Sequence, residues 1–222
     1  MLLSEAITGV DAGFDTIRET VPPIGAHRHA TPILPRRGRL VRSHELLDPR
    51  YAPGSDRVVY LMRDLRDVVV SLHDHTIRMG RPDAGIEPFC EEFLAGRVAN
   101  FGPWTDHVSR ALDRAASSPS STLLVRYEDL LSDAPAQVST ILAFLGVAVG
   151  AERIDMAVAN NAFDRMRLKE HESSYLRSRG DVQRPLVRQG RSGAWRTELP
   201  AASQILISEK AGPTLARAGY ES

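Results

Sequence analysis

The sequence predicts an α/β fold with a parallel sheet, because two short apolar runs are each followed by a helical pattern. The runs are residues 58–62, VVYLM, and residues 122–127, TLLVRY. Both are rich in strand-forming side chains and are typical of strands buried on both faces of a parallel sheet. Strands that alternate with helices along the chain indicate an α/β architecture.

Composition and charge predict a single globular domain over residues 1–222. The 28 basic and 28 acidic residues cancel, so no global field favours nucleic acid or an anionic membrane. The single cysteine excludes an internal disulfide and fits a reducing compartment. No apolar run reaches the length of a membrane span, and the first residues lack the basic start of a signal peptide. We therefore expect a cytoplasmic protein that binds neither nucleic acid nor membrane.

The chain before the first strand is predicted to contain one helix and a long irregular stretch. Residues 1–9 have the pattern of the end of an amphipathic helix, with no capping residue before the apolar part. Residues 11–38 contain repeated prolines and are predicted to be irregular. Residues 39–42, RLVR, are predicted to form a short strand that leads into Ser43 and His44.

Helices and a loop are expected between the two strands. Asp64 suits the N-cap of a helix, and Asp67 favours its first turn electrostatically. A loop is expected over residues 80–88, followed by a helical segment. A further helix with one face inward is indicated by the four-residue spacing of Trp104, Val108 and Leu112.

Two helices and a loop are expected beyond the second strand. Helical spacing of apolar side chains is found at Val138, Ile141, Leu142 and Leu145. Gly146 suits the left-handed position after this helix. Another helix is predicted over residues 152–169, and the glycine-containing residues 176–196 are predicted to form a mobile loop.

The end of the first strand predicts an anion-binding crevice. Arg63 stands at the carboxyl end of the strand, and Ser71 lies two helical turns after Asp64. Ligands of open α/β sheets bind at this position, and the free N–H groups of a helix start favour anions. The alternative is a surface Arg63 that pairs with Asp64 or Asp67.

The segment Arg177–Arg196 is a second candidate for anion binding. It carries six arginines and one acidic residue inside a neutral protein. The planar guanidinium group matches the oxygens of phosphate or sulfate. The same composition also fits a solvated basic loop, or a patch that contacts nucleic acid.

Three separated stretches resemble the sulfotransferase family that uses 3′-phosphoadenosine 5′-phosphosulfate (PAPS). YLMRDLRDVVVSL resembles the Arg-x-Pro-x-Asp strand–helix motif of that family. LLVRYEDLLSDAP resembles its Tyr-Glu-Asp-Leu segment, and VRQGRSGAW resembles its C-terminal Arg-Lys-Gly-x-x-Gly-Asp-Trp loop. Two shorter stretches add to this: residues 42–44 resemble Lys-Thr-His, and Phe163 with Met166 resembles Phe-x-x-Met.

The resemblance implies a role for each matching residue. His44 is implied as the base that removes the proton of an acceptor hydroxyl, for which an imidazole pKa near neutrality is suited. Without the resemblance, the favoured interpretation of His44 is a strand-end histidine that backbone groups satisfy. Tyr127 is implied near the adenine, and Phe163 in the packing of the base. The residues implied to hold the 3′-phosphate are Arg63, Ser71, Arg188, Gln189 and Gly190.

The resemblance also implies a P-loop-like three-layer fold, with a central parallel sheet and helices on both faces. The implied reaction transfers a sulfuryl group from PAPS to a hydroxyl of a small molecule or glycan. The N-terminal phosphosulfate loop of the family has no counterpart in this sequence, so we expect its first strand and loop to be missing. The chain departs from the motifs at four positions: Asn161 for Thr, Leu65 for Pro, Gln189 for Lys and Ala194 for Asp.

Two alternatives to catalysis stay open. The missing loop favours a catalytically degenerate member of the same fold that binds a nucleotide or a partner. The segment Arg177–Arg196 also fits a polyanion-binding protein, whose affinity would fall steeply with salt. No metal is expected, because the histidine pairs 27/29 and 73/75 lack a third ligand, and Cys90 is expected to be a packed thiol.

Overall fold

The computed structural model of the chain describes residues 1–25, 30–44, 57–98, 102–178 and 185–221. The chain forms two compact units, and each is made of two separate segments. The helical unit comprises Met1–Arg57 and Asp129–Gly190, and the sheet unit comprises Val58–Glu128 and Arg191–Ser222. A single domain over residues 1–222 stays a prediction.

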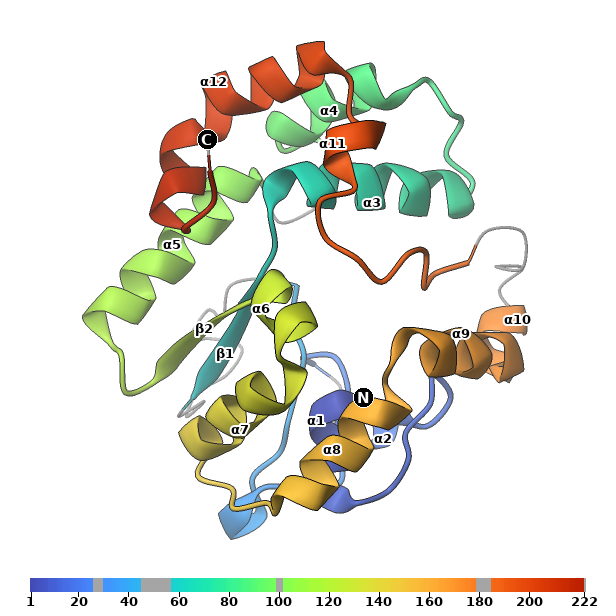
Figure 1. The fold of residues 1–222 in the computed structure, drawn as a ribbon, viewed down its shortest axis with the longest axis vertical. Helices are drawn as coiled ribbons and strands as arrows, with labels where there is room; N and C mark the ends of the chain where they lie inside the picture. Colours follow the sequence, from blue (N-terminus) through green and yellow to red (C-terminus); the bar gives the residue numbers. More distant parts are fainter. Residues whose placement is uncertain (26–29, 45–56, 99–101, 179–184, 222) are drawn as a thin grey trace. The chain divides into compact units, whose positions relative to one another are not determined.

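The sheet unit is built on two parallel strands, β1 (Val58–Met62) and β2 (Thr122–Arg126) (Figure 1). They pair in register along their whole length. This confirms the predicted parallel sheet and both strand positions to within one residue. The expected burial on both faces is wrong for β1, since Leu61 is 55% exposed. Among the described residues the sheet has two strands, so each keeps one unpaired edge.

Among its described residues, the sheet unit has five further helices. In Figure 1, α12 runs beside α4, and it also contacts α3 and α5. A further short helix, α6 (Tyr127–Ser132), follows β2 without a loop and leads from the sheet unit into the helical unit. The five helices are α3 (Leu65–Arg78), α4 (Ile86–Leu94), α5 (Trp104–Ser117), α11 (Trp195–Glu198) and α12 (Ala201–Arg217).

Helix α3 begins where the sequence places it, because Asp64 caps it. The Asp64 carboxylate accepts the backbone N–H of Arg66 at 2.9 Å, which satisfies one of the free donors of the first turn. Helix α4 begins earlier than predicted, and the expected loop over residues 80–88 is wrong at its end. Pro88 stands in the first turn of α4, where a missing N–H costs no intrahelical hydrogen bond.

The apolar core of the sheet unit lies where β1 and its helices meet. Leu65 and Val69 of α3 are fully buried in it, together with Ile207 of α12. Cys90 of α4 is buried in the same core, as the sequence predicts for a packed thiol. Burial raises the pKa of the Cys90 thiol to about 11, so the group stays protonated at neutral pH.

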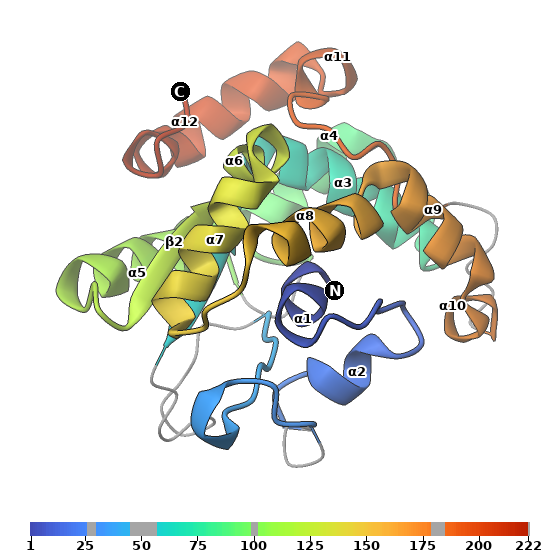
Figure 2. The same cartoon turned by 60° about the horizontal axis from the view of Figure 1, so that its bottom comes forward.

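The helical unit packs its helices around a smaller core of Ala6, Val138, Leu142, Ile154 and Ala157. Figure 2 shows α1 lying against α8, which agrees with their contacts. The described elements of this unit are α1 (Leu2–Thr8), α2 (Ile17–Thr20), a 3-10 turn (Pro35–Arg37), α7 (Ala134–Leu145), α8 (Ala151–Asn160), α9 (Phe163–Glu172) and α10 (Ser174–Ser178).

Two predictions for the helical unit are confirmed. Residues 2–8 form the expected N-terminal helix. Gly146 ends α7 with a φ of 73°, and its N–H donates to the carbonyl of Leu142 and that of Ala143. That left-handed conformation is open to glycine without the cost that a Cβ imposes.

The single helix predicted over residues 152–169 is wrong, because the chain breaks at Asn161. The Asn161 side-chain amide donates to Glu5 Oε2 and to the Ala157 carbonyl, both at 2.8 Å. Glu5 is only 3% exposed, so its carboxylate needs such donors. A tertiary hydrogen bond therefore ends α8, and no local pattern signals it.

The segments at the edges of the predicted site also differ from expectation. Residues 39–42 form no strand, since Arg42 makes one isolated bridge with Pro23. The loop predicted over residues 176–196 is too long at both ends, because its first residues belong to α10 and its last residues belong to α11. Its described part from residue 185 to residue 194 is without helix or strand, as predicted.

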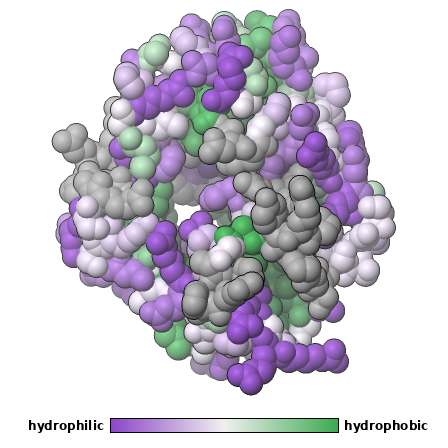
Figure 3. Space-filling view, turned by 180° about the vertical axis from the view of Figure 1, so that it is seen from behind, coloured by the Kyte–Doolittle hydropathy of each residue, from purple (hydrophilic) through white to green (hydrophobic). Residues whose placement is uncertain are grey.

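Within the described ranges, no helix has both the length and the apolar character needed to cross a membrane. On the face drawn in Figure 3, hydrophobic residues form separate patches among hydrophilic ones.

Asp15 predicts an acid-sensitive contact inside the helical unit. Its carboxylate accepts the hydroxyl of Ser173 at 2.5 Å and the N–H groups of Ser174 and Tyr175 at 3.0 Å, which caps α10 from a distant segment. The hydrogen bond from Ser173, with the two N–H groups, lowers the pKa of Asp15 to about 2. Because this pKa lies below the ordinary value of 3.8, the stabilisation is present above about pH 4 and is lost as the pH falls through about 2.

We therefore expect Asp15→Asn to lower the melting temperature near pH 6, and to match the wild type as the pH approaches 2. Melting curves from pH 7 to pH 2 measure this difference. The exposed Asp155 of α8 supplies the control Asp155→Asn. A constant difference between Asp15→Asn and the wild type across this range would contradict the assignment.

Candidate functional site

The turn between β1 and α3 brings together two residues that the sequence predicts for the site. Arg63 follows β1 directly, and its guanidinium carbon lies 4.5 Å from the centroid of the Tyr127 ring. Tyr127 follows β2 directly, so the pair forms at the carboxyl ends of the two parallel strands. A guanidinium over an aromatic face is held by the ring quadrupole and keeps its N–H groups for other acceptors.

Arg63 has an unsatisfied donor. Its Nε is buried and has no hydrogen-bond partner in the described part of the chain. Its Nη2 donates to the Arg191 carbonyl at 3.2 Å and lies 3.8 Å from the Asp67 carboxylate. Buried polar groups rarely stay without partners, and a guanidinium is matched by phosphate or sulfate oxygens. The site therefore fits an anionic group at Arg63.

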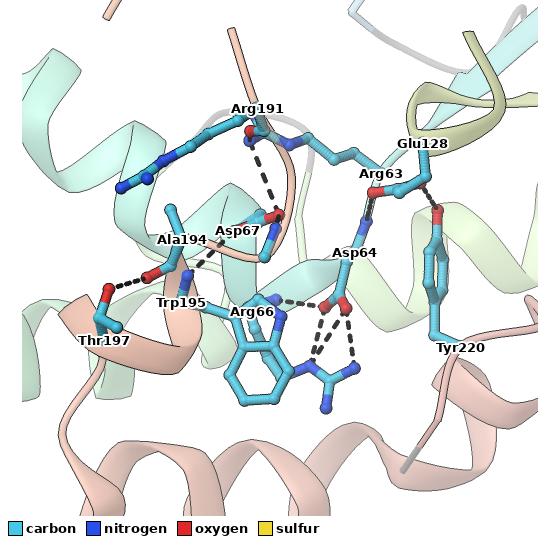
Figure 4. Close-up of polar contacts among 11 residues, drawn as sticks. Arg63, Asp64, Arg66, Asp67, Glu128, Arg191, Ala194, Trp195, Thr197 and Tyr220 are labelled. Carbon is cyan, nitrogen blue, oxygen red and sulfur yellow. Dashed lines mark hydrogen bonds and ion pairs between the residues drawn. The ribbon is translucent and has the colours of Figure 1, made fainter. Parts of the chain in front are cut away.

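Asp67 joins this turn to the C-terminal loop (Figure 4). The side chain is 1% exposed and accepts the N–H of Gly193 at 2.7 Å and the N–H of Trp195 at 3.1 Å. The sequence predicts Asp67 only as a first-turn residue or as an ion-pair partner of Arg63. Its contact with the loop was not predicted, because the partners lie more than 120 positions away.

Arg66 and Asp64 form an ion pair at the start of α3, beside the first residue of α11. Asp64 accepts three hydrogen bonds from the Arg66 guanidinium, at 2.9, 3.2 and 2.7 Å, so Asp64 pairs with Arg66 and not with Arg63. The Arg66 guanidinium carbon in turn lies 3.9 Å from the Trp195 ring centroid. Figure 4 shows Arg66 between Asp64 and the indole of Trp195. Leu65, in the place of the family's proline, is fully buried in the core.

A cleft of about 290 Å³ lies beside this turn, lined by residues that include Arg126, Glu128 and Tyr220. Glu128 accepts the Asp64 N–H at 3.1 Å and the Tyr220 hydroxyl at 3.0 Å. Burial, with the nearby charge of Glu128, raises the pKa of Tyr220, so the phenol stays a donor. Glu128 thus has a structural role at the end of β2, where it holds the start of α3.

Ser71 lies on the same helix as Asp67, one turn further along. It is half-buried, and the four-residue spacing places both side chains on one face of α3.

In the helical unit, the structure brings Gly190 and Phe163 together. Gly190 has a φ of 61°, and a Cβ built on it would lie 2.4 Å from Phe163 Cδ2. Phe163 opens α9 and is 39% exposed. The glycine is therefore required by both its backbone conformation and the ring against which it lies.

The segment before Gly190 is held along α9. The Glu170 carboxylate accepts the N–H of Leu186 and, at 3.0 Å, the N–H of Val187. Arg167 Nη1 donates to the Val187 carbonyl at 3.0 Å. The half-buried Arg188 and Gln189 follow this anchored stretch. Neither Glu170 nor Arg167 was predicted as part of the site.

The predicted residues are thus divided between the two units. His44 is exposed in the helical unit, two positions after Arg42, whose backbone bonds to Pro22 and Ile24. The helical group is His44, Phe163, Arg188, Gln189 and Gly190, and the sheet group is Arg63, Ser71 and Tyr127.

No group of three or more His, Cys, Asp or Glu side chains that could hold a metal is found in the described segments. His27 and His29 lie outside those segments. His73 is packed, with Nε2 3.3 Å from Asp83 and its ring edge-on to Phe89.

The chain is similar to sulfotransferases in sequence. Residues 35–215 match the family model described as a sulfotransferase domain. Sulfotransferase 1A1 of Mus musculus is 27% identical over 203 residues, which are 87% of this chain and 63% of that protein. Sulfotransferase 2B1 of Rattus norvegicus is 33% identical over 172 residues, which are 74% and 50%. The chain therefore spans between half and two thirds of the length of these curated relatives.

Solved structures show the same fold. Retinol dehydratase in complex with androsterone and the inactive cofactor PAP matches with a TM-score of 0.70 and 25% identity, over 82% of this chain and 54% of that chain. Mouse sulfotransferase SULT7A1 complexed with PAP matches with a TM-score of 0.66 and 19% identity, over 81% and 66%. The predicted fold of parallel sheet and flanking helices is thereby confirmed.

Gly190→Ala is expected to loosen the segment on α9. The left-handed conformation costs an alanine about 1–2 kcal/mol, and the contact with the Phe163 ring adds to this cost. Chemical unfolding measures the loss of stability, and hydrogen exchange at Leu186 and Val187 measures the local release. In a Phe163→Ala background the ring contact is absent, so only the backbone cost of about 1–2 kcal/mol should remain. An equal loss in both backgrounds would show that the ring does not constrain Gly190.

Proposed function

The chain belongs to the sulfotransferase family, and we propose that it transfers a sulfuryl group from PAPS to a hydroxyl of a small-molecule acceptor. The observation that carries this proposal is Arg63 over the Tyr127 ring, with a buried donor that has no partner in the described chain. PAP, present in the similar structures, is PAPS without its sulfuryl group, and two of those structures hold androsterone or retinol.

In this proposal, the residues that match the family motifs hold the nucleotide. Arg63, Ser71 and Arg188 bind the 3′-phosphate, and the guanidinium groups supply charge-assisted hydrogen bonds to it. Tyr127 lies near the adenine, and Phe163 packs against the base. Gln189 and Gly190 close over the 3′-phosphate with their backbone. The left-handed Gly190 against Phe163 supports this arrangement, because it fixes how the closing segment leaves α9.

His44 is proposed as the general base. It takes the proton of the acceptor hydroxyl, whose oxygen forms the new bond to sulfur while the bond from sulfur to the phosphate oxygen of PAPS breaks. PAP leaves as the second product. Such a transfer depends mostly on positioning and on electrostatic stabilisation of the equatorial and leaving oxygens. A neutral imidazole accepts a proton readily near pH 7.

The proposed location is the cytoplasm. A further relative, Cytosolic sulfotransferase 1 of Danio rerio, is 28% identical over 177 residues, and its name supports this proposal.

Arg63→Ala is expected to reduce the preference for a 3′-phosphate. Removing one charge-assisted contact should weaken PAP binding by about 10–100-fold and leave AMP, which lacks the 3′-phosphate, within about twofold. Isothermal titration with both nucleotides measures the ratio. Arg217→Ala is the matched control, since Arg217 pairs with the exposed Asp113 on the surface of the sheet unit.

A wild-type chain that binds PAP and AMP equally would overturn the proposed nucleotide site. Binding of any long polyanion with a steep salt dependence, and without this preference, would support the alternative in which Arg177–Arg196 contacts polyanions. PAP binding without transfer to any hydroxyl would support a degenerate binding member of the family.

His44→Ala is expected to lower sulfuryl transfer by about 100-fold or more while PAP affinity stays unchanged, because only the proton acceptor is lost. Transfer from radiolabelled PAPS to phenol and steroid hydroxyls measures the rate, and titration measures PAP binding. His171→Ala, at another exposed histidine of the same unit, is the control. Full transfer by His44→Ala would exclude the base role.

A further inference from the structure

We propose that Asp67 is a positioning residue for the 3′-phosphate. By holding Arg63 and the loop around Gly193 in one arrangement, it determines how tightly Arg63 binds that phosphate. This inference rests on the proposed function and assigns a role to a residue that the motif comparison leaves without one. Asp67 touches no nucleotide in this proposal and acts through Arg63.

The burial of Asp67 requires its partners. A carboxylate that is 1% exposed is stable only when hydrogen bonds and an opposite charge replace its water. Asp67 has two strong N–H donors, from Gly193 at 2.7 Å and from Trp195 at 3.1 Å. Its cation is Arg63, whose Nη2 lies 3.8 Å away. All of these partners belong to the turn and the loop of the proposed site.

Arg63 and Asp67 bind the backbone of the same loop, Arg63 as a hydrogen-bond donor and Asp67 as an acceptor. Arg63 Nη2 donates to the carbonyl of Arg191, while Asp67 accepts the N–H two residues later. The loop backbone and the ion pair therefore close a ring of contacts between Arg63, Asp67 and residues 191–193. Tyr127 supports the guanidinium from its face at 4.5 Å. This fixes the direction in which the remaining donors of Arg63, including the buried Nε, point.

Asp67→Asn separates this role from simple packing. The amide keeps the size of the side chain but offers one acceptor oxygen, so it satisfies one of the two N–H groups and presents its own N–H₂ to the other. It also removes the charge that faces Arg63. We expect PAP affinity to fall by about tenfold while AMP affinity stays within about twofold, because only PAP uses the 3′-phosphate contact.

Arg66→Gln is the matched control for the loop. Arg66 is also buried and stacks on Trp195, but its ion pair is with Asp64 and not with Arg63. Its loss should lower the melting temperature and leave the ratio of PAP to AMP affinity unchanged. Asp67→Glu is the second variant: it keeps the charge, but its extra methylene displaces the carboxylate, and we expect an intermediate ratio.

The ratio of PAP to AMP affinity in the wild type, Asp67→Asn, Asp67→Glu and Arg66→Gln decides the proposal. An unchanged ratio in Asp67→Asn overturns it, and so does an equal loss of the ratio in Arg66→Gln. If Asp67→Asn does not fold, a wild-type ratio in Asp67→Glu overturns it instead.

A readout without nucleotide separates this inference from the proposed function. The NMR signal of the Arg63 side-chain Nε–H reports its position in the ligand-free protein. We expect Asp67→Asn to shift this signal and to speed hydrogen exchange at Gly193 and Trp195, and Arg66→Gln to leave the Arg63 signal in place. An unmoved Arg63 signal in Asp67→Asn overturns the positioning role. Equal binding of PAP and AMP by the wild type, with a shifted signal, overturns the proposed function and leaves only the positioning of Arg63 by Asp67.

Discussion

The buried carboxylate of Asp67 is the constraint on which the sheet unit depends. A charge taken out of water must recover its lost hydration from a few fixed donors, and here two of them are backbone N–H groups of the C-terminal loop. Once these are fixed, Trp195 lies against Arg66, and α11 and α12 follow in the direction that places Ile207 in the core. The hydrogen bonds of the Asp67 carboxylate at the start of α3 therefore fix where the last segment of the sheet unit begins.

The sequence correctly predicted the helix ends that are set by contacts between residues close together in the chain. Asp64 caps α3, and Gly146 ends α7 in the left-handed conformation, because each acts on backbone groups within four residues. The break at Asn161 was not predicted, since its partner Glu5 lies 156 positions away.

Helix α12 was not predicted either. Gly212 and Pro213 within it disfavour a helix, and the burial of Leu215 outweighs their cost.

The candidate site, like the fold, was predicted only in part. Arg63 and Tyr127 could be placed together from the sequence, because parallel strands present their carboxyl ends at one edge. The contact of Gly190 with Phe163 makes neighbours of two residues that the sequence suggested only through separate motifs. The contacts of Asp67 and Glu170 with the loop backbone were not predicted. Each of these carboxylates accepts backbone N–H groups of another segment, and no side chain in the sequence marks such a partner.

The interleaved order of the two units has a consequence for synthesis of the chain. The core around Leu65 and Val69 stays incomplete until Ile207 and Leu215 have left the ribosome, because α12 supplies one wall of that core. The whole second segment of the helical unit is made in the meantime. The apolar surface of α3 and α5 that α12 covers therefore stays exposed until α12 is made. This favours slow, late folding of the sheet unit, since contacts between distant segments must form before the core closes.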